Sequence, residues 1–236
     1  MGFFMFLACF QVSAQDVKVD DIINNYLKNT GGAENWKQVK SMKMTGKMSM
    51  QNMEFPLVIY RMPEKKQRIE ASIQGKEIIQ AYDGTDAWWI NPFMSGPEAQ
   101  PMPDEMASEM KEETFEDVFI DYKKKGHQAE LEGKETIDGA ETYKVKLTKK
   151  GGDIRYYFFE TENYVPIMIR STVKEGQAKG QNIDTMLSDY QEVEGFVIPH
   201  FMEVRMNGQA GQKIILEAIT FNEKMDESMF AFPKKQ

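Results

Sequence analysis

The stretch that decides the fold runs from Met42 to Met50 and reads MKMTGKMSM. Methionine occupies positions 42, 44, 48 and 50, whereas lysine, threonine, lysine and serine occupy positions 43, 45, 47 and 49. Successive side chains of a β-strand point to opposite faces, so this alternation is typical of a strand with one apolar and one solvated face.

Runs of the same kind follow at short spacing along most of the chain. They are Met53–Met62, Arg68–Ile73, Lys76–Tyr82, Ala87–Ile90, Gln128–Leu131, Glu141–Thr148, Ile154–Phe159, Tyr164–Val173, Ile183–Tyr190, Val197–Met206 and Lys213–Phe221. Turn-forming pairs separate many of them, namely Asp83-Gly84, Asp138-Gly139, Gly151-Gly152, Glu194-Gly195 and Asn207-Gly208. Strands do not alternate with helices, which argues against a parallel nucleotide-binding sheet. The sequence predicts a mainly β (α+β) fold with a curved antiparallel sheet of about 11–12 strands.

Helical patterns occur in two places. Val19 to Leu27 has helical spacing and ends before Gly31-Gly32, and a second short helix is expected over Ala33–Val39. Between Asn91 and Lys125 the strands are interrupted, and four prolines predict irregular structure over Asn91–Pro103. Met102, Met106 and Met110 then recur every four residues, and Phe115, Val118, Phe119 and Tyr122 predict a second amphipathic helix. These helices either plug the concave side of the sheet or fill an ordinary core.

The N-terminus has the features of a secretory signal. Residues 2–10 are apolar or small, and Val12-Ser13-Ala14 before Gln15 fits a cleavage site, which predicts a signal peptide over residues 1–14. A short buried strand and acylation of Cys9, the chain's only cysteine, are the alternatives. The apolar run is too short to span a bilayer. We therefore expect an exported periplasmic protein with a single domain over residues 15–236.

Composition and motifs favour binding over catalysis. A net charge of −8 argues against nucleic acid and against anionic membrane surfaces, and 18 methionines with 15 phenylalanines suggest an adaptable apolar surface. His127 and His200, the only histidines, stand apart, and His200 shares the parity of a buried strand face. The Lys/Glu alternation over Glu130–Lys150 indicates a solvated face. No nucleophile, phosphate-binding or metal motif occurs, so we expect no enzyme activity, cofactor or metal, although a glycosidase-type carboxylate pair stays formally open.

Three segments resemble the periplasmic outer-membrane lipoprotein carriers of the LolA/LolB-like family. They are YRMPEKKQRIE at 60–70, AYDGTDAWWINPF at 81–93 and FNEKMDESMFAFP at 221–233. The family shows an Arg-Pro strand end, a D-G-x-x-x-W-x-x-N-P hairpin and an F-x-F-x-P tail. The resemblance implies a half-open barrel with an N-terminal helix and a helical lid over an apolar cavity that shelters acyl chains. Here Met62 separates Arg61 from Pro63, and the chain is longer than typical carriers.

Arg61 attracts attention independently, because it ends the apolar row of Met53, Phe55, Leu57 and Ile59. A buried guanidinium needs partners, whereas the alternative is a strand-end arginine that reaches solvent. The resemblance implies that Arg61 ties the lid shut through lid backbone. The adjacent Trp88 and Trp89 must face opposite sides of their strand. The expected cavity residues are Arg61, Phe55, Leu57, Ile59, Met44, Met48, Trp88, Trp89, Met102, Met106, Met110, Phe115 and Phe119.

We expect a monomeric carrier that shelters the acyl chains of lipoproteins, or lipid, while this cargo is sorted to the outer membrane. Its partners would be an inner-membrane donor complex and an outer-membrane acceptor, with no nucleic acid. The alternative is a periplasmic hydrophobic-ligand-binding or envelope-stress sensory module on the same scaffold, without transfer activity. A hydrolase acting on envelope material is the third reading.

Overall fold

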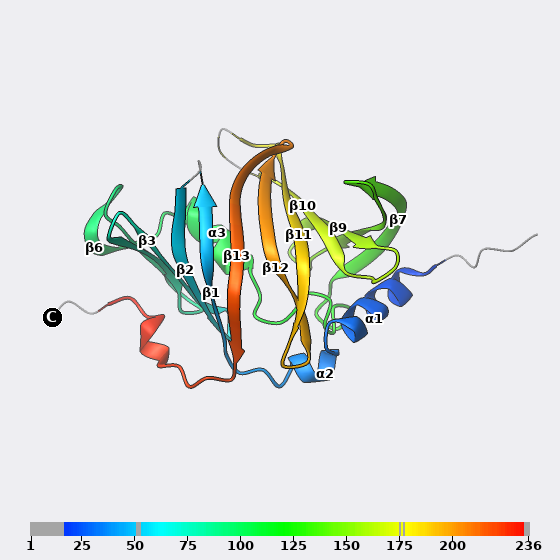
Figure 1. Cartoon of the computed structure of the whole chain (residues 1–236), viewed down its shortest axis with the longest axis horizontal. Coiled ribbons are helices and arrows are strands. Elements are labelled where there is room, and N and C mark those ends of the chain that lie inside the picture. Colours follow the sequence, from blue (N-terminus) through cyan, green and yellow to red (C-terminus); the bar gives the residue numbers. More distant parts are fainter. Residues whose placement is uncertain (1–16, 51–52, 175, 177, 234–236) are drawn as a thin grey trace, which may run out of the picture.

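The computed structural model describes residues 17–50, 53–174, 176 and 178–233, so the expected signal peptide over residues 1–14 and Cys9 lie outside the description. Most of the described chain forms one antiparallel sheet of 13 strands in the order β6-β5-β4-β3-β2-β1-β13-β12-β11-β10-β9-β8-β7. The sheet curves without closing into a barrel (Figure 1). The predicted mainly β fold is confirmed, although the sheet has 13 strands where about 11–12 were expected.

The strands are β1 Met42–Met50, β2 Met53–Met62, β3 Lys66–Ile73, β4 Lys76–Tyr82, β5 Ala87–Asn91, β6 Gly96–Pro101, β7 Gln128–Ile137, β8 Ala140–Thr148, β9 Ile154–Glu160, β10 Pro166–Thr172, β11 Asn182–Val193, β12 Phe196–Met206 and β13 Gln209–Phe221. The helices are α1 Val19–Asn29, α2 Ala33–Trp36, α3 Asp104–Glu112 and the 3-10 helix η1 Glu227–Met229. None of the helices in the described ranges has the length and apolar character that a bilayer span requires.

Tight turns join most neighbouring strands, as predicted. In Asp138-Gly139, Glu194-Gly195 and Asn207-Gly208 both residues have positive φ. That is the geometry of two-residue hairpin turns whose twist matches the flanking strands, and Asp, Asn and Gly tolerate it best. These pairs therefore set the register of three hairpins.

Two local predictions are wrong. The irregular structure expected over Asn91–Pro103 contains strand β6, which forms one edge of the sheet and pairs only with β5. Proline lacks an amide donor, but an edge strand leaves one side without a partner, so Pro97 and Pro101 are tolerated there.

The amphipathic helix expected from Phe115 to Tyr122 is instead a series of turns. The Asp117 carboxylate accepts the N–H of Phe119 at 2.8 Å, and Asp121 has a φ of 51°. Such side-chain bonds to nearby backbone compete with helical hydrogen bonds. The apolar spacing still directs Phe119 and Tyr122 into the core, where they are 1% and 7% exposed. The lid thus contains one helix rather than two.

The connection from β6 to β7 has to cross the whole sheet, because these strands form its two opposite edges. We call residues 102–127 the crossing segment and the face that it covers the inner face. Met102, Ala107 and Met110 pack on Tyr82 and Trp89 in one half of the sheet. Phe119 and Tyr122 pack with α1 on β8 and β9 in the other half, and Phe115 packs between them on the cluster around Met42.

The C-terminal tail covers part of the opposite, outer face. Phe230 is 0% exposed, and its carbonyl accepts the Trp88 indole N–H at 2.7 Å. The Met229 carbonyl accepts a hydrogen bond from Arg68 at 2.8 Å, and the Arg68 guanidinium lies 5.4 Å from the centre of the Trp88 ring. The tail therefore seals a hydrophobic cluster on β4 and β5 that the crossing segment does not reach.

Gly46 tests the central pairing of β1 with β13, where the register shifts between Thr45 and Gly46. A Cβ at Gly46 would lie 2.0 Å from the Ile215 carbonyl oxygen, so Gly46→Ala forces backbone to move. We expect a loss of more than about 2 kcal/mol in the free energy of unfolding, measured by urea titration. Gly151→Ala is the control, since its Cβ meets nothing within 4 Å. Equal stability of the two variants would contradict the register.

Candidate functional site

Strand pairing confirms that the predicted apolar row of β2 lies on the inner face. Met42 pairs with Arg61, Met44 with Ile59 and Met48 with Phe55, so side chains of the two strands share one surface. Arg61 in turn pairs with Gln67, whose side-chain amide donates to the Met110 carbonyl of α3 at 2.8 Å. The row therefore faces the crossing segment.

Two cavities separate the crossing segment from the sheet. The central cavity, of about 320 Å³, lies under residues 112–118 and includes Arg61, Phe115, Met42, Lys149, Arg155 and Tyr157 in its wall. The α3 cavity, of about 450 Å³, is lined by Gln67, Ile69, Gln80, Met102, Met106, Met110 and Glu113. Both volumes fall in the range of about 300–1,000 Å³ that small-molecule sites usually have. Glu113 belongs to both walls, so the cavities adjoin at this residue.

The expected cavity residues divide into three groups. Arg61 and Phe115 line the central cavity, and Met102, Met106 and Met110 line the α3 cavity. The remaining inner-face residues line neither cavity: Met44, Phe55, Leu57, Ile59, Trp89 and Phe119 pack in the core, and Met48 is half-buried. Their role in ligand binding stays a prediction.

The two tryptophans point to opposite faces, and the structure assigns them. Trp89 packs with Met102 and Met110 on the inner face. Trp88 lies on the outer face, where it is 1% exposed beneath Phe230. Placing Trp88 among the cavity residues was therefore wrong, because strand parity sets it beneath the C-terminal tail.

Arg61 connects β2 to the crossing segment. Its Nη2 donates to the Thr114 carbonyl oxygen at 2.8 Å and lies 3.2 Å from a carboxylate oxygen of Glu113. The side chain is 22% exposed, so this guanidinium is largely removed from water and has the backbone partner that the resemblance implied. The solvent-facing alternative is excluded by this geometry.

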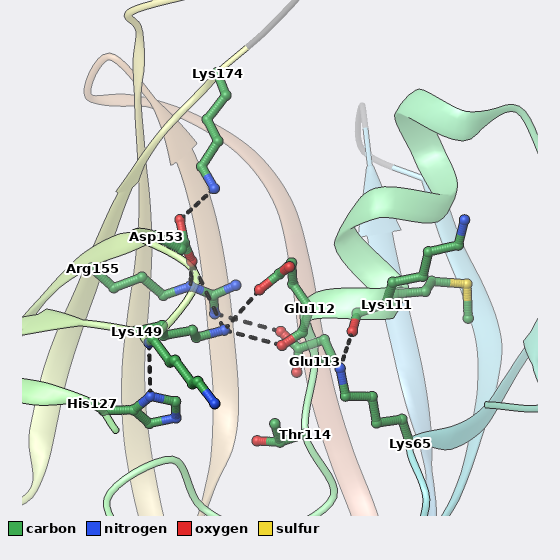
Figure 2. A network of polar contacts seen from close by, with 12 residues as sticks. Lys65, Lys111, Glu112, Glu113, Thr114, His127, Lys149, Asp153, Arg155 and Lys174 are labelled. Atoms are coloured by element: carbon green, nitrogen blue, oxygen red, sulfur yellow. Dashed lines mark hydrogen bonds and ion pairs between the residues drawn. The ribbon is translucent and has the colours of Figure 1, made fainter. Parts of the chain in front are cut away.

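A second cationic group approaches the same segment from the opposite half of the sheet (Figure 2). Arg155 of β9 lies 3.6 Å from Glu113, and Lys149, in the turn before β9, lies 3.6 Å from the Glu112 carboxylate. Lys149 also donates to the Glu112 carbonyl at 3.0 Å, and its side chain is only 10% exposed. The expectation of a fully solvated face up to Lys150 was therefore wrong at Lys149.

Sequence reasoning missed Arg155, although the signal that singled out Arg61 was present. In β9, Arg155 shares the parity of Tyr157 and Phe159, which are both in the buried inner-face cluster. A guanidinium that ends a buried row requires a polar partner. Applying the same rule to every strand would have found it.

The central cavity also contains a carboxyl group held against aromatic side chains. The Tyr26 hydroxyl of α1 donates to Asp117, which also accepts the Phe119 amide. Burial raises the pKa of Asp117 more than these bonds lower it, and burial together with Asp117 raises the pKa of Tyr26. This pair joins α1 to the crossing segment.

Both histidines have hydrogen-bond partners within the protein. Within the described residues, no three His, Cys, Asp or Glu side chains are placed to hold a metal ion. His200 is 4% exposed, with a ring nitrogen 3.0 Å from the Ile198 carbonyl oxygen, as expected of a satisfied core histidine. His127 accepts the Lys150 amide at 3.0 Å and so helps to shape the turn before β9.

Comparison with solved structures identifies the fold. A DUF1329 family protein from Desulfovibrio piger superposes with a TM-score of 0.61 at 11% identity, covering 91% of this chain and 97% of that one. A domain from Vibrio parahaemolyticus, provisionally assigned to outer membrane lipoprotein sorting, gives 0.58 at 10% identity, with 89% and 94% covered. A LolA superfamily protein from Nitrosomonas europaea gives 0.55 at 11% identity, with 91% and 98% covered. The chain therefore has the LolA-like fold that the sequence segments suggested.

Sequence comparison is less informative about function. A family model described only as an uncharacterized protein matches residues 68–233. No curated protein matches the sequence. At 10–11% identity, the structural neighbours show the fold and do not identify a ligand.

Asp117→Asn tests the buried carboxyl group. A pKa that is raised by folding means that the folded chain binds the proton more tightly, so wild-type stability rises as pH falls through the raised pKa toward the unfolded value near 3.8. The asparagine can still accept the Phe119 amide and donate to Tyr26. We expect the melting temperature of wild type, relative to the variant, to rise as pH falls from about 8 to about 4.

The comparison uses the difference between the two proteins because other carboxylates act in the opposite direction. Lys37 and Lys124, for example, lower the pKa of Asp121 to about 2. A difference that does not change with pH would contradict a raised pKa at Asp117.

Proposed function

We propose that this chain, which belongs to the family of uncharacterized proteins matched over residues 68–233, shelters lipoprotein or lipid acyl chains between its sheet and its crossing segment. In this proposal residues 15–236 act as one monomeric domain in the periplasm, after removal of residues 1–14. The domain would take cargo from an inner-membrane donor complex and release it to an outer-membrane acceptor. The observation that carries the proposal is the pair of adjoining cavities beneath a segment fastened by side chains.

The α3 cavity has side chains suited to variable acyl chains. Three methionines of the crossing segment line it together with Ile69. Methionine is unbranched and has three rotatable bonds, so it adapts to chains of different length and saturation. Met106 is 37% exposed, whereas Met102 and Met110 are each 7% exposed. Met106 is therefore the methionine that a ligand would reach without disturbing the core.

The crossing segment is attached by contacts that can be exchanged. Besides Arg61, the Lys65 ammonium donates to the Lys111 carbonyl at 2.7 Å and Gln67 to the Met110 carbonyl. These bonds cluster on residues 110–114, at the C-terminal end of α3 and just after it. Apolar contacts fix the two ends of the crossing segment, whereas a few polar bonds hold its middle, which favours a middle part that opens and closes over cargo.

Binding rather than catalysis is also the activity that the polar groups favour. In the central cavity the cations Arg61, Lys149 and Arg155 form ion pairs with Glu112 and Glu113, and ion pairs of this kind serve attachment rather than activation of a nucleophile. Acyl-chain burial contributes about 0.8 kcal/mol per CH₂ group, which suffices for affinity without any polar recognition.

The direct test is binding of an environment-sensitive fatty-acid probe to the purified mature chain. We expect saturable binding with about one probe per chain, reversed by added lipid. Native mass spectrometry of the same preparation should show co-purified lipid. Probe fluorescence that stays at the buffer level at every protein concentration would contradict the proposal.

Met106→Asp locates that binding in the α3 cavity. A carboxylate there should weaken probe binding about tenfold, while thermal stability changes little, since Met106 is already partly exposed. Met94→Asp is the matched control, because Met94 is 73% exposed in the turn between β5 and β6. Parallel loss of binding and stability at Met106 would indicate a purely structural methionine.

Arg61→Leu tests the transfer step. The leucine extends the apolar row of β2, and Glu113 keeps Arg155 as a partner, so the chain should still fold and bind. Without the bond to Thr114, loading is no longer linked to closure. We expect transfer of a labelled lipoprotein to acceptor membranes to fall about tenfold or more.

Probe binding and circular dichroism of the Arg61 variant serve as controls. Transfer at the wild-type rate would remove Arg61 from the mechanism. Binding without transfer in the wild type itself would favour the hydrophobic-ligand-binding or sensory alternative.

A further inference from the structure

A cluster of charged side chains lies in and beside the central cavity (Figure 2). Arg61, Lys149, Arg155 and Lys174 form ion pairs with Glu112, Glu113 and Asp153. Asp153 alone lies within 4 Å of three of these cations. The two other carboxyl groups of the cavity wall have partners of their own, since Glu116 pairs with Lys125 at 2.9 Å and Asp117 accepts the Tyr26 hydroxyl.

Arg155, in the cavity wall, has hydrogen-bond donors that the surrounding side chains do not fully satisfy. Arg155 lies 3.6 Å from Glu113 and 3.5 Å from Asp153, beyond the 2.7–3.2 Å typical of N–H···O hydrogen bonds. Its Nε is buried and has no hydrogen-bond partner within the described residues. Lys149 lies 3.6 Å and 3.8 Å from its two carboxylates. Lys149 also donates to the Glu112 carbonyl oxygen at 3.0 Å, and burial, together with the neighbouring Arg155, lowers its pKa.

Apolar groups continue the same cavity wall. Met42, Phe115, Ile169 and Ile198 line the central cavity together with Arg61, Lys149 and Arg155. A pocket with cationic donors at one part of its wall and apolar side chains at another fits an amphiphile better than it fits a plain hydrocarbon. Planar guanidinium donors are suited to both carboxylate and phosphate oxygens.

We propose that the central cavity binds an amphiphile with one anionic headgroup, a carboxylate or a phosphate, whose oxygens take the donors of Arg155 and Lys149. This inference rests on the proposed function and specifies its ligand. The acyl chain would lie along the apolar wall, past Phe115. The incoming anion replaces Glu113 at Arg155, because both compete for the same donors.

Replacement of Glu113 has a mechanical result. Glu113 lies between Arg61 of β2 and Arg155 of β9, so it links the two halves of the sheet through the crossing segment. An anionic ligand frees Glu113 from Arg155 and leaves the segment attached on the β2 side. Loading then loosens one side of the cover while Arg61 still holds Thr114.

The test compares three ligands with the same alkyl chain: dodecanoate, dodecyl phosphate and dodecanol. Each competes with a neutral fluorescent probe on the full mature chain. We expect both anions to bind about tenfold more tightly than the alcohol, the factor that one or two charge-assisted hydrogen bonds supply. The stronger of the two anions identifies a fatty-acid or a phospholipid type of headgroup.

Variants assign the effect to the cluster. Arg155→Gln should reduce the affinity of both anions to that of dodecanol and leave dodecanol unchanged, whereas the exposed neighbour Lys150→Gln should change none of them. Glu113→Gln should instead increase the affinity of the anions, because it removes the competing carboxylate. A purely structural role does not produce this increase, so the second variant decides the matter if Arg155→Gln fails to fold.

The outcomes separate the two proposals. Absence of binding for all three ligands would overturn the proposed function. Equal binding of anions and alcohol by the wild type, or weaker anion binding by Glu113→Gln, would overturn the headgroup site and leave an acyl-chain carrier.

Discussion

The strands that begin and end the β6–β7 connection lie at opposite edges of the sheet, and the rest of the structure depends on this constraint. A chain that leaves one edge and re-enters at the other has to run across a face, and the inner face is apolar. The crossing segment thereby covers a surface that an unclosed sheet cannot bury by itself. The crossing segment, residues 102–127, is too short to fill the whole concave face of a 13-stranded sheet. Both cavities lie where it leaves that face unfilled.

Polar groups determine how that cover is held. Apolar anchors fix its two ends, at Met102 and Met110 on one side and at Phe119 and Tyr122 on the other. Between them residues 112–117 carry the charged contacts to Arg61, Lys149 and Arg155. Ion pairs in a half-buried place depend on exact partners, whereas apolar contacts tolerate sliding. The middle of the crossing segment is therefore the part whose position responds to a charged ligand.

The sequence predicted most of the sheet because period-2 alternation and glycine turns are local signals, clear in β1 and in Asn207-Gly208. It failed for Phe115–Tyr122, where spacing alone could not reveal that Asp117 bonds to backbone and ends the helix. Arg61 was found because it ends an apolar row. The partnership of Arg61 with Arg155 through Glu113 was not accessible, since it joins residues 61, 113 and 155, which only the folded chain brings together.

An open sheet has two edge strands, and the unpaired backbone groups of an edge strand can pair with strands of other chains and cause aggregation. Pro97 and Pro101 of β6 lack the amide N–H groups that another strand would need for pairing at this edge. Strand β7 forms the other edge, with exposed Glu130, Glu132 and Lys134 and a register shift near Gly133 that distorts its pairing with β8. Pro97 and Pro101, which suggested irregular structure in the sequence, thus oppose edge-to-edge pairing of one open sheet with another.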